Sequence, residues 1–199
     1  MKKTLVVLAV LLAALMAVSA ADIAFVAGAD LGFGINNHTY KGIGSFDTKE
    51  SDIYLGAFGE AYFTDEVAAY AEMGLALPVK YTLLDVDFTD DAKNSFVLAV
   101  GAAYKHNLQK GLDLIGKGGI SIASSSVSGD SHKYSFSTVS LQLAASARYV
   151  LEKKQGLSLD GGVKANIVLG GSSKYDNTKQ DVDVSGFDFM PYVGVTKAF

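Results

Sequence analysis

Six charged residues are spaced so that one closed sheet could gather them in its interior. Each lies on the polar side of a segment in which apolar and polar residues alternate, and alternate residues of a strand point to opposite faces. In a narrow interior, opposite charges pair as salt bridges or line a gated path for ions. We favour a salt-bridged core over a gate. The predicted interior charge network is Asp30, Glu60, Glu72, Lys117, Arg148 and Lys164. Counted from the short turns, Glu60 and Arg148 should lie nearest those turns and the other four at middling depth.

The chain offers little for metal, cofactor or phosphate binding. Its three histidines, His38, His106 and His132, are expected in two loops and a turn, without metal-ligand spacing, and there is no cysteine to assist them. The glycine clusters "GKGG" and "LGGSS" lack the Lys-Ser/Thr of a phosphate-binding loop. We therefore expect no catalytic, cofactor or metal site.

The elements that must position the charges are strands. From residue 22 to residue 34, for example, Phe25, Leu31 and Phe33 fall on one face while Asp30 and several glycines fall on the other. The same alternation indicates eight strands, at residues 22–34, 52–63, 66–77, 95–106, 112–124, 134–151, 157–170 and 186–199.

The connections between these segments alternate in length. Short turns are predicted around Thr64 and Asp65, at "HNLQKG" and at "EKKQG". The other connections are mostly long and polar, and part of the second is also compatible with an extension of its strands; they cover residues 35–51, 78–94, 125–133 and 171–186.

The first residues have the character of an export signal. Lys2 and Lys3 precede an apolar run of about 14 residues, and Val18-Ser19-Ala20 supplies the small side chains of a cleavage site. The apolar run is too short for a membrane anchor. We predict a cleaved signal peptide at residues 1–21 and one domain at residues 22–199. Loss of two lysines changes the formal charge from −4 to about −6, which argues against a nucleic-acid partner.

An exported all-β chain with one oily face has two possible surroundings. A soluble barrel would turn the oily face inward, whereas a membrane barrel turns it outward and must be closed, because every backbone group in hydrocarbon needs a partner. An even strand number, alternating short and long connections and aromatics near the segment ends favour the second. The predicted fold is an all-β, eight-stranded antiparallel up-and-down transmembrane β-barrel.

In this architecture the chain resembles the small eight-stranded outer-membrane barrels that include the OmpA transmembrane domain and OmpX. The resemblance implies a bacterial outer-membrane location and a carboxyl-terminal signal read by the barrel-assembly machinery, matched here by Gly194 and Phe199. Lys197 departs from that signal, since an apolar residue is expected at its position. No wall-anchoring domain is expected after the barrel.

The expected function is structural or one of surface interaction. Outer-membrane lipids are expected partners. The long loops would contact an extracellular ligand or host protein, and they contain Tyr40, Lys41, Phe46, Asp47, Lys174, Tyr175 and the acidic residues Asp181 and Asp183. A narrow ion-conducting pore is the alternative. A lipid A-modifying enzyme is a third, because some barrels of this type use a His with a nearby Ser, which Ser131-His132 could imitate.

Overall fold

The computed structural model describes residues 23–42, 45–128, 133–152, 154–176, 178–180 and 182–199. The predicted signal peptide, at residues 1–21, lies outside this part of the chain. Within the described ranges, no helix has the length and apolar character needed to cross a membrane.

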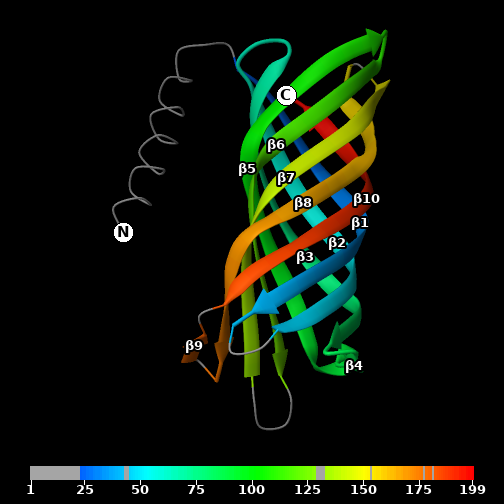
Figure 1. The fold of residues 1–199 in the computed structure, drawn as a ribbon. Coiled ribbons are helices and arrows are strands. Elements are labelled where there is room, and N and C mark those ends of the chain that lie inside the picture. Colours follow the sequence, from blue (N-terminus) through cyan, green and yellow to red (C-terminus); the bar gives the residue numbers. More distant parts are fainter. Residues whose placement is uncertain (1–22, 43–44, 129–132, 153, 177, 181) are drawn as a thin grey trace.

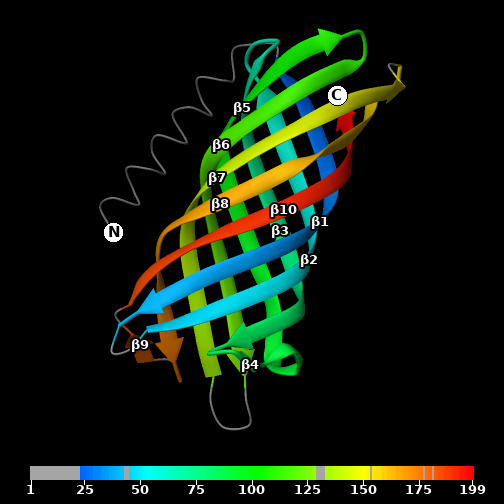
Figure 2. The same ribbon diagram turned by 45° about the vertical axis from the view of Figure 1, so that its right-hand side comes forward.

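The described residues form a closed ring of eight long strands (Figures 1 and 2). Each strand pairs antiparallel with the next, and the last pairs with both the first and the preceding long strand, so the sheet has no free edge. This confirms the eight-stranded up-and-down barrel predicted from the sequence. The ring consists of β1 (Ala24–Lys41), β2 (Ser45–Tyr62), β3 (Val67–Leu83), β5 (Ala92–Gln109), β6 (Leu112–Ser128), β7 (Lys133–Glu152), β8 (Leu157–Tyr175) and β10 (Asp183–Ala198).

The two ends of the barrel differ. The short turns β2–β3, β5–β6 and β7–β8 lie at one end together with the end of β10, and we call this the turn end. The opposite end, called the far end, carries two short strands, β4 (Val86–Asp87) paired with β3 and β9 (Thr178–Gln180) paired with β8 (Figure 1). A short 3-10 helix, η2 (Thr89–Asp91), follows β4.

The predicted long loops are wrong over most of their length, because the strands continue through them. Between residues 35 and 51, β1 and β2 stay paired from Ile35 opposite Ser51 to Lys41 opposite Ser45. At a rise of roughly 3.3 Å per residue, the 18 residues of β1 reach about 60 Å, whereas an apolar membrane band is only about 25 Å tall. Even with the tilt of about 40° that such strands have, they span about 45 Å along the barrel axis, so part of the barrel extends beyond such a band.

The outward face shows where the band stops. Ile122 on β6 lies opposite Val139 on β7, and their side chains are 49% and 40% exposed on the outside. One outward step farther, Ser124 lies opposite Ser137. The large exposed apolar residues Leu114 and Ile120 on β6 and Leu143 on β7 lie on the turn-end side of this boundary. The oily face of the strands thus points outward, as the sequence predicts.

Beyond the boundary the polarity of the two faces reverses. Tyr40, expected in an exposed loop, is only 1% exposed inside the barrel, where its ring stacks on Phe46 at 5.0 Å and meets Phe136 at 4.9 Å. The far-end apolar cluster comprises the buried residues Tyr40, Tyr81, Leu83, Val127, Phe136, Val168 and Val184. The far end therefore has the inside-apolar pattern of a water-soluble protein.

Candidate functional site

The interior near the turn end holds four charged side chains, called the turn-end cluster. Arg148 on β7 donates to both oxygens of Glu60 on β2, at 2.8 and 2.9 Å, and to Asp160 on β8 at 2.8 Å. Lys117 on β6 reaches Glu60 at 2.8 Å. All four residues are buried. Two cations facing two carboxylates leave no net charge, which is the condition under which buried ions are tolerated.

A second group, called the middle cluster, lies one layer farther along the barrel. Lys164 on β8 donates to Asp30 on β1 at 2.6 Å and also to Glu72 on β3. The Tyr54 hydroxyl donates to the same Glu72 at 2.6 Å. One oxygen each of Asp30 and Glu72 has no hydrogen-bond partner among the described residues. This cluster therefore carries one more carboxylate than cations.

The structure gathers all six residues of the predicted network, but in two groups rather than one. Lys117 was expected at the depth of Lys164, yet its amine pairs with Glu60 in the turn-end cluster. Asp160 belongs to the turn-end cluster but not to the predicted network, although this residue lies on the polar face of its strand and opposite Arg148 in the ladder. That register was the signal that could have identified it.

Aromatic rings fill the space that glycines leave between the charges. A Cβ on Gly28 would lie 2.6 Å from the Phe58 ring, and a Cβ on Gly74 would overlap the ring of Tyr54. Lys117 lies over the Phe58 ring, with its amine 4.0 Å from the centroid. Rings packed against inward glycines and cations leave little open space in the interior between the turn end and the middle cluster.

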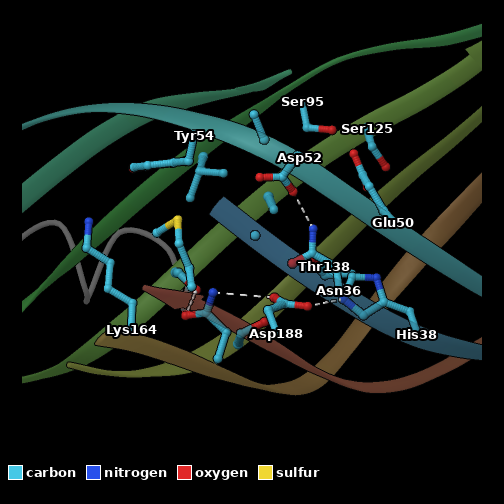
Figure 3. A pocket seen from close by; sticks show the side chains of 18 of the residues that line it. Asn36, His38, Glu50, Asp52, Tyr54, Ser95, Ser125, Thr138, Lys164 and Asp188 are labelled. Carbon is cyan, nitrogen blue, oxygen red and sulfur yellow. Dashed lines mark hydrogen bonds and ion pairs between the residues drawn. The ribbon is translucent and has the colours of Figure 1, made fainter. Parts of the chain in front are cut away.

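An acidic cavity of about 70 Å³ lies between the middle cluster and the far-end apolar cluster (Figure 3). Glu50, Asp52 and Asp188 line it, and Lys164 forms part of the boundary toward the middle cluster. At roughly 10 to 15 Å³ for each water, there is room for about five to seven waters.

His38 is not a loop residue, contrary to the prediction. It lies on β1 and lines the acidic cavity, where its Nε2 is 2.6 Å from Asp188. His106 lies on β5, and His132 falls outside the described residues. In the part of the chain that the structure describes, no group of three His, Cys, Asp or Glu residues could hold a metal ion.

The two residues of the predicted assembly signal lie on and beside β10. Gly194 pairs with Asp30, and a Cβ there would come within 2.6 Å of the Ala29 carbonyl. Phe199 is 74% exposed, while its backbone N–H donates to the carbonyl of Phe25 at 2.8 Å. Recognition by an assembly machinery stays a prediction.

Several solved structures share this architecture at low sequence identity. OprG from Pseudomonas aeruginosa matches with a TM-score of 0.61 and 14% identity, over 90% of this chain and 96% of that chain. Neisserial surface protein A matches with a TM-score of 0.59 and 14% identity, over 88% and 99%. The outer membrane protease OmpT from Escherichia coli matches with a TM-score of 0.52 and 9% identity, over 89% and 96%. At these identities the likeness shows the fold alone.

The sequence itself carries the family assignment. None of the curated proteins matches the chain. A family model described as the outer membrane protein beta-barrel domain matches residues 8–190, which is most of the chain. With the closed ring and its outward oily face, this match places the chain in the bacterial outer membrane. The chain belongs to the family of outer membrane proteins with this beta-barrel domain.

Proposed function

We propose that the protein is a sealed outer-membrane barrel with a structural and surface-contact role. In barrels of this kind the short turns face the periplasm, so the turn end is periplasmic and the far end extracellular. The observation that supports the proposal is the packing of buried side chains at three levels of the interior: the turn-end cluster, the middle cluster and the far-end apolar cluster. A barrel closed in this way acts through its surfaces.

Conductance in planar bilayers tests the closure. The purified wild-type protein and Glu72→Gln are expected to give silent traces, because removing one charge from the middle cluster leaves the other two levels intact. Asp47→Asn, whose side chain faces outward on the same strand as Glu60, is the control for a charge change outside the barrel. Reproducible unit steps from the wild type that change in Glu72→Gln but not in Asp47→Asn would refute a sealed interior.

A narrow pore is the second candidate. The acidic cavity favours it, because this chamber already occupies one part of the interior beside Glu72 and Lys164. To conduct, the Lys164 ion pairs would have to open, and the far-end apolar cluster would also have to part. The conductance comparison separates this candidate from the sealed barrel.

The tip of the β3–β4 hairpin is the best-supported contact point on the extracellular side. Leu84 is 62% exposed and Val86 is 55% exposed at this tip. Leu84 also has a φ of 54°, a left-handed conformation that branched apolar residues adopt at a cost. An exposed apolar side chain held in a strained turn is the kind of feature that binding maintains.

Surface display tests this contact point. A non-adherent laboratory strain that displays the protein is expected to bind cell monolayers, and Leu84→Ser with Val86→Ser is expected to lose most of that binding. Leu108→Ser is the matched control, since Leu108 is 52% exposed but lies at the turn end. Equal adhesion of the hairpin variant and the control would exclude the hairpin as the contact.

We further propose that the protein is not an enzyme. His38 is engaged with Asp188 inside the barrel, away from the lipid surface on which a lipid A-modifying enzyme must act. Comparing lipid A acyl chains from expressing and deletion strains tests this, and any difference that depends on His38 or His132 would contradict it.

Outer-membrane lipids and the barrel-assembly machinery are the proposed partners. The exposed band, from Phe25 to Ile35 on β1 for example, supports the first. The exposed Phe199 ring supports the second. Replacing Phe199 with Ser is expected to lower the amount of folded barrel in the membrane while leaving refolding of the purified chain in detergent unchanged. A loss of refolding as well would assign Phe199 a purely structural role.

A further inference from the structure

The acidic cavity combines features that a sealed structural barrel does not use. Glu50 and Asp52 come from β2 and Asp188 from β10, and their strands flank β1 on its two sides. In the ladder, Asn36 of β1 pairs with both Glu50 and Asp188, so Glu50 and Asp188 lie on one rung. Figure 3 shows them around a common space with Ser95 and Thr138.

The charges that line the cavity do not cancel. Its basic side chains are His38 and Lys164. Lys164 is already held by Asp30 and Glu72, and His38 has a single partner, Asp188. Asp52 receives a hydrogen bond of 2.6 Å from the Asn36 amide, which is neutral. Glu50 and Asp52 are therefore left without a cation, in a place where a buried charge is costly unless it is paired.

Two acceptors aim into the same space without a partner. Ser95 is only 6% exposed and lines the cavity, and its hydroxyl has no hydrogen-bond partner among the described residues. The Oε1 atom of Glu50 is also buried without a partner. An ammonium group, with several N–H donors and a positive charge, is a suitable partner for acceptors of this kind.

The far-end wall of the cavity favours an organic cation over a bare metal ion. Tyr40 and Phe136, from the far-end apolar cluster, line it with aromatic rings whose centroids are 4.9 Å apart. Aromatic faces attract ammonium groups and their attached methyl groups. The described residues offer no cluster that could hold a metal ion. A cavity lined by both carboxylates and aromatic rings suits an alkylammonium group.

We propose that the acidic cavity, formed by Glu50, Asp52, Asp188 and Ser95 beneath Tyr40 and Phe136, binds a small organic cation that carries an ammonium group. A volume of about 70 Å³ suits a ligand of a few heavy atoms, such as methylammonium. With so few atoms in contact, the affinity is weak.

Titration with methylammonium chloride tests the proposal. The probe is added to the isotope-labelled protein in detergent micelles, and the amide resonances of residues that line the cavity are expected to shift and saturate. Sodium chloride at the same ionic strength is the control for charge. Absence of saturation, or equal shifts with sodium, would overturn the proposal.

Variants locate the site. Glu50→Gln is expected to weaken methylammonium binding about tenfold, because it removes a charged hydrogen-bond acceptor. Ser95→Ala is expected to weaken it less and keeps every charge, so it reports on the site even if Glu50→Gln folds poorly. Asp47→Asn, on the same strand but outside the barrel, should bind as the wild type does. Wild-type affinity in both Glu50→Gln and Ser95→Ala would contradict the site.

Discussion

Arg148 and Glu60, 88 positions apart in the chain, face each other inside the barrel through two hydrogen bonds of 2.8 and 2.9 Å. The guanidinium and the carboxylate meet side by side, in the planar geometry that gives such pairs their strength. The same guanidinium also holds Asp160. One side chain thus ties β2, β7 and β8 together near the turn end.

Replacing Arg148 with Leu is expected to lower the free energy of unfolding by about 3 to 5 kcal/mol, because Glu60 and Asp160 lose their shared partner. Urea unfolding of the refolded barrel, followed by circular dichroism, measures this. Lys49→Ala is the control, since Lys49 and its partner Asp85 have side chains 61% and 90% exposed. The control should cost less than about 1 kcal/mol. Similar losses of unfolding free energy in the two variants would show that the buried pair stabilises the barrel no more than the exposed pair does.

Two turn glycines are expected to differ in their tolerance of alanine. Gly156 has a φ of 67°, and a Cβ there would lie 2.6 Å from the carbonyl of Ala198. Gly111 has a φ of 87°, but a Cβ there would meet no atom within 4 Å. Gly111→Ala should therefore cost about 1 kcal/mol from backbone strain alone. Gly156→Ala should cost about 2 to 4 kcal/mol, because the clash adds to the strain. The urea midpoints of the two variants measure the difference in stability. Equal midpoints would contradict the close approach of Gly156 to the end of β10.

Relief of strain at the β3–β4 tip is expected to stabilise the barrel. Asn adopts the left-handed conformation of Leu84 at lower cost, so Leu84→Asn should raise the free energy of unfolding by about 0.5 to 1 kcal/mol. Val86→Asn is the matched control, because Val86 is equally exposed but lies in a strand, where Asn is unfavourable. Thermal unfolding of both variants measures the difference. A less stable Leu84→Asn would mean that the Leu84 side chain packs in the native state.

The sequence predicted the barrel where its two faces have opposite and constant polarity. Leu75 and Glu72, for example, fall on opposite faces of one strand by simple alternation. The closed sheet follows because an open edge would leave backbone groups without partners in lipid. At the far end the alternation continues, but apolar residues such as Tyr40 move to the inward face. A period-two pattern whose faces exchange polarity is easily read as a polar loop, which is why the strands were predicted too short.

The pairing inside the barrel was less predictable than the set of charges. Which carboxylate Lys117 reaches depends on the length of its side chain and on the rings of Phe58 and Tyr70 beside it. Likewise, His38 meets Asp188 only because β1 pairs with β10 when the ring closes. Such contacts join residues far apart in the chain, and a local pattern does not contain them.

The boundary between Ile122 and Ser124 on β6 tests the placement of the barrel in the membrane most directly. The chain has no cysteine, so single cysteines can be introduced at these two outward positions and treated on intact cells with a membrane-impermeant maleimide. Ser124→Cys is expected to react, and Ile122→Cys is expected to react only after the protein is denatured. Equal reactivity of the two on intact cells, or protection of Ser124→Cys, would contradict an oily face that points into lipid and stops at this rung.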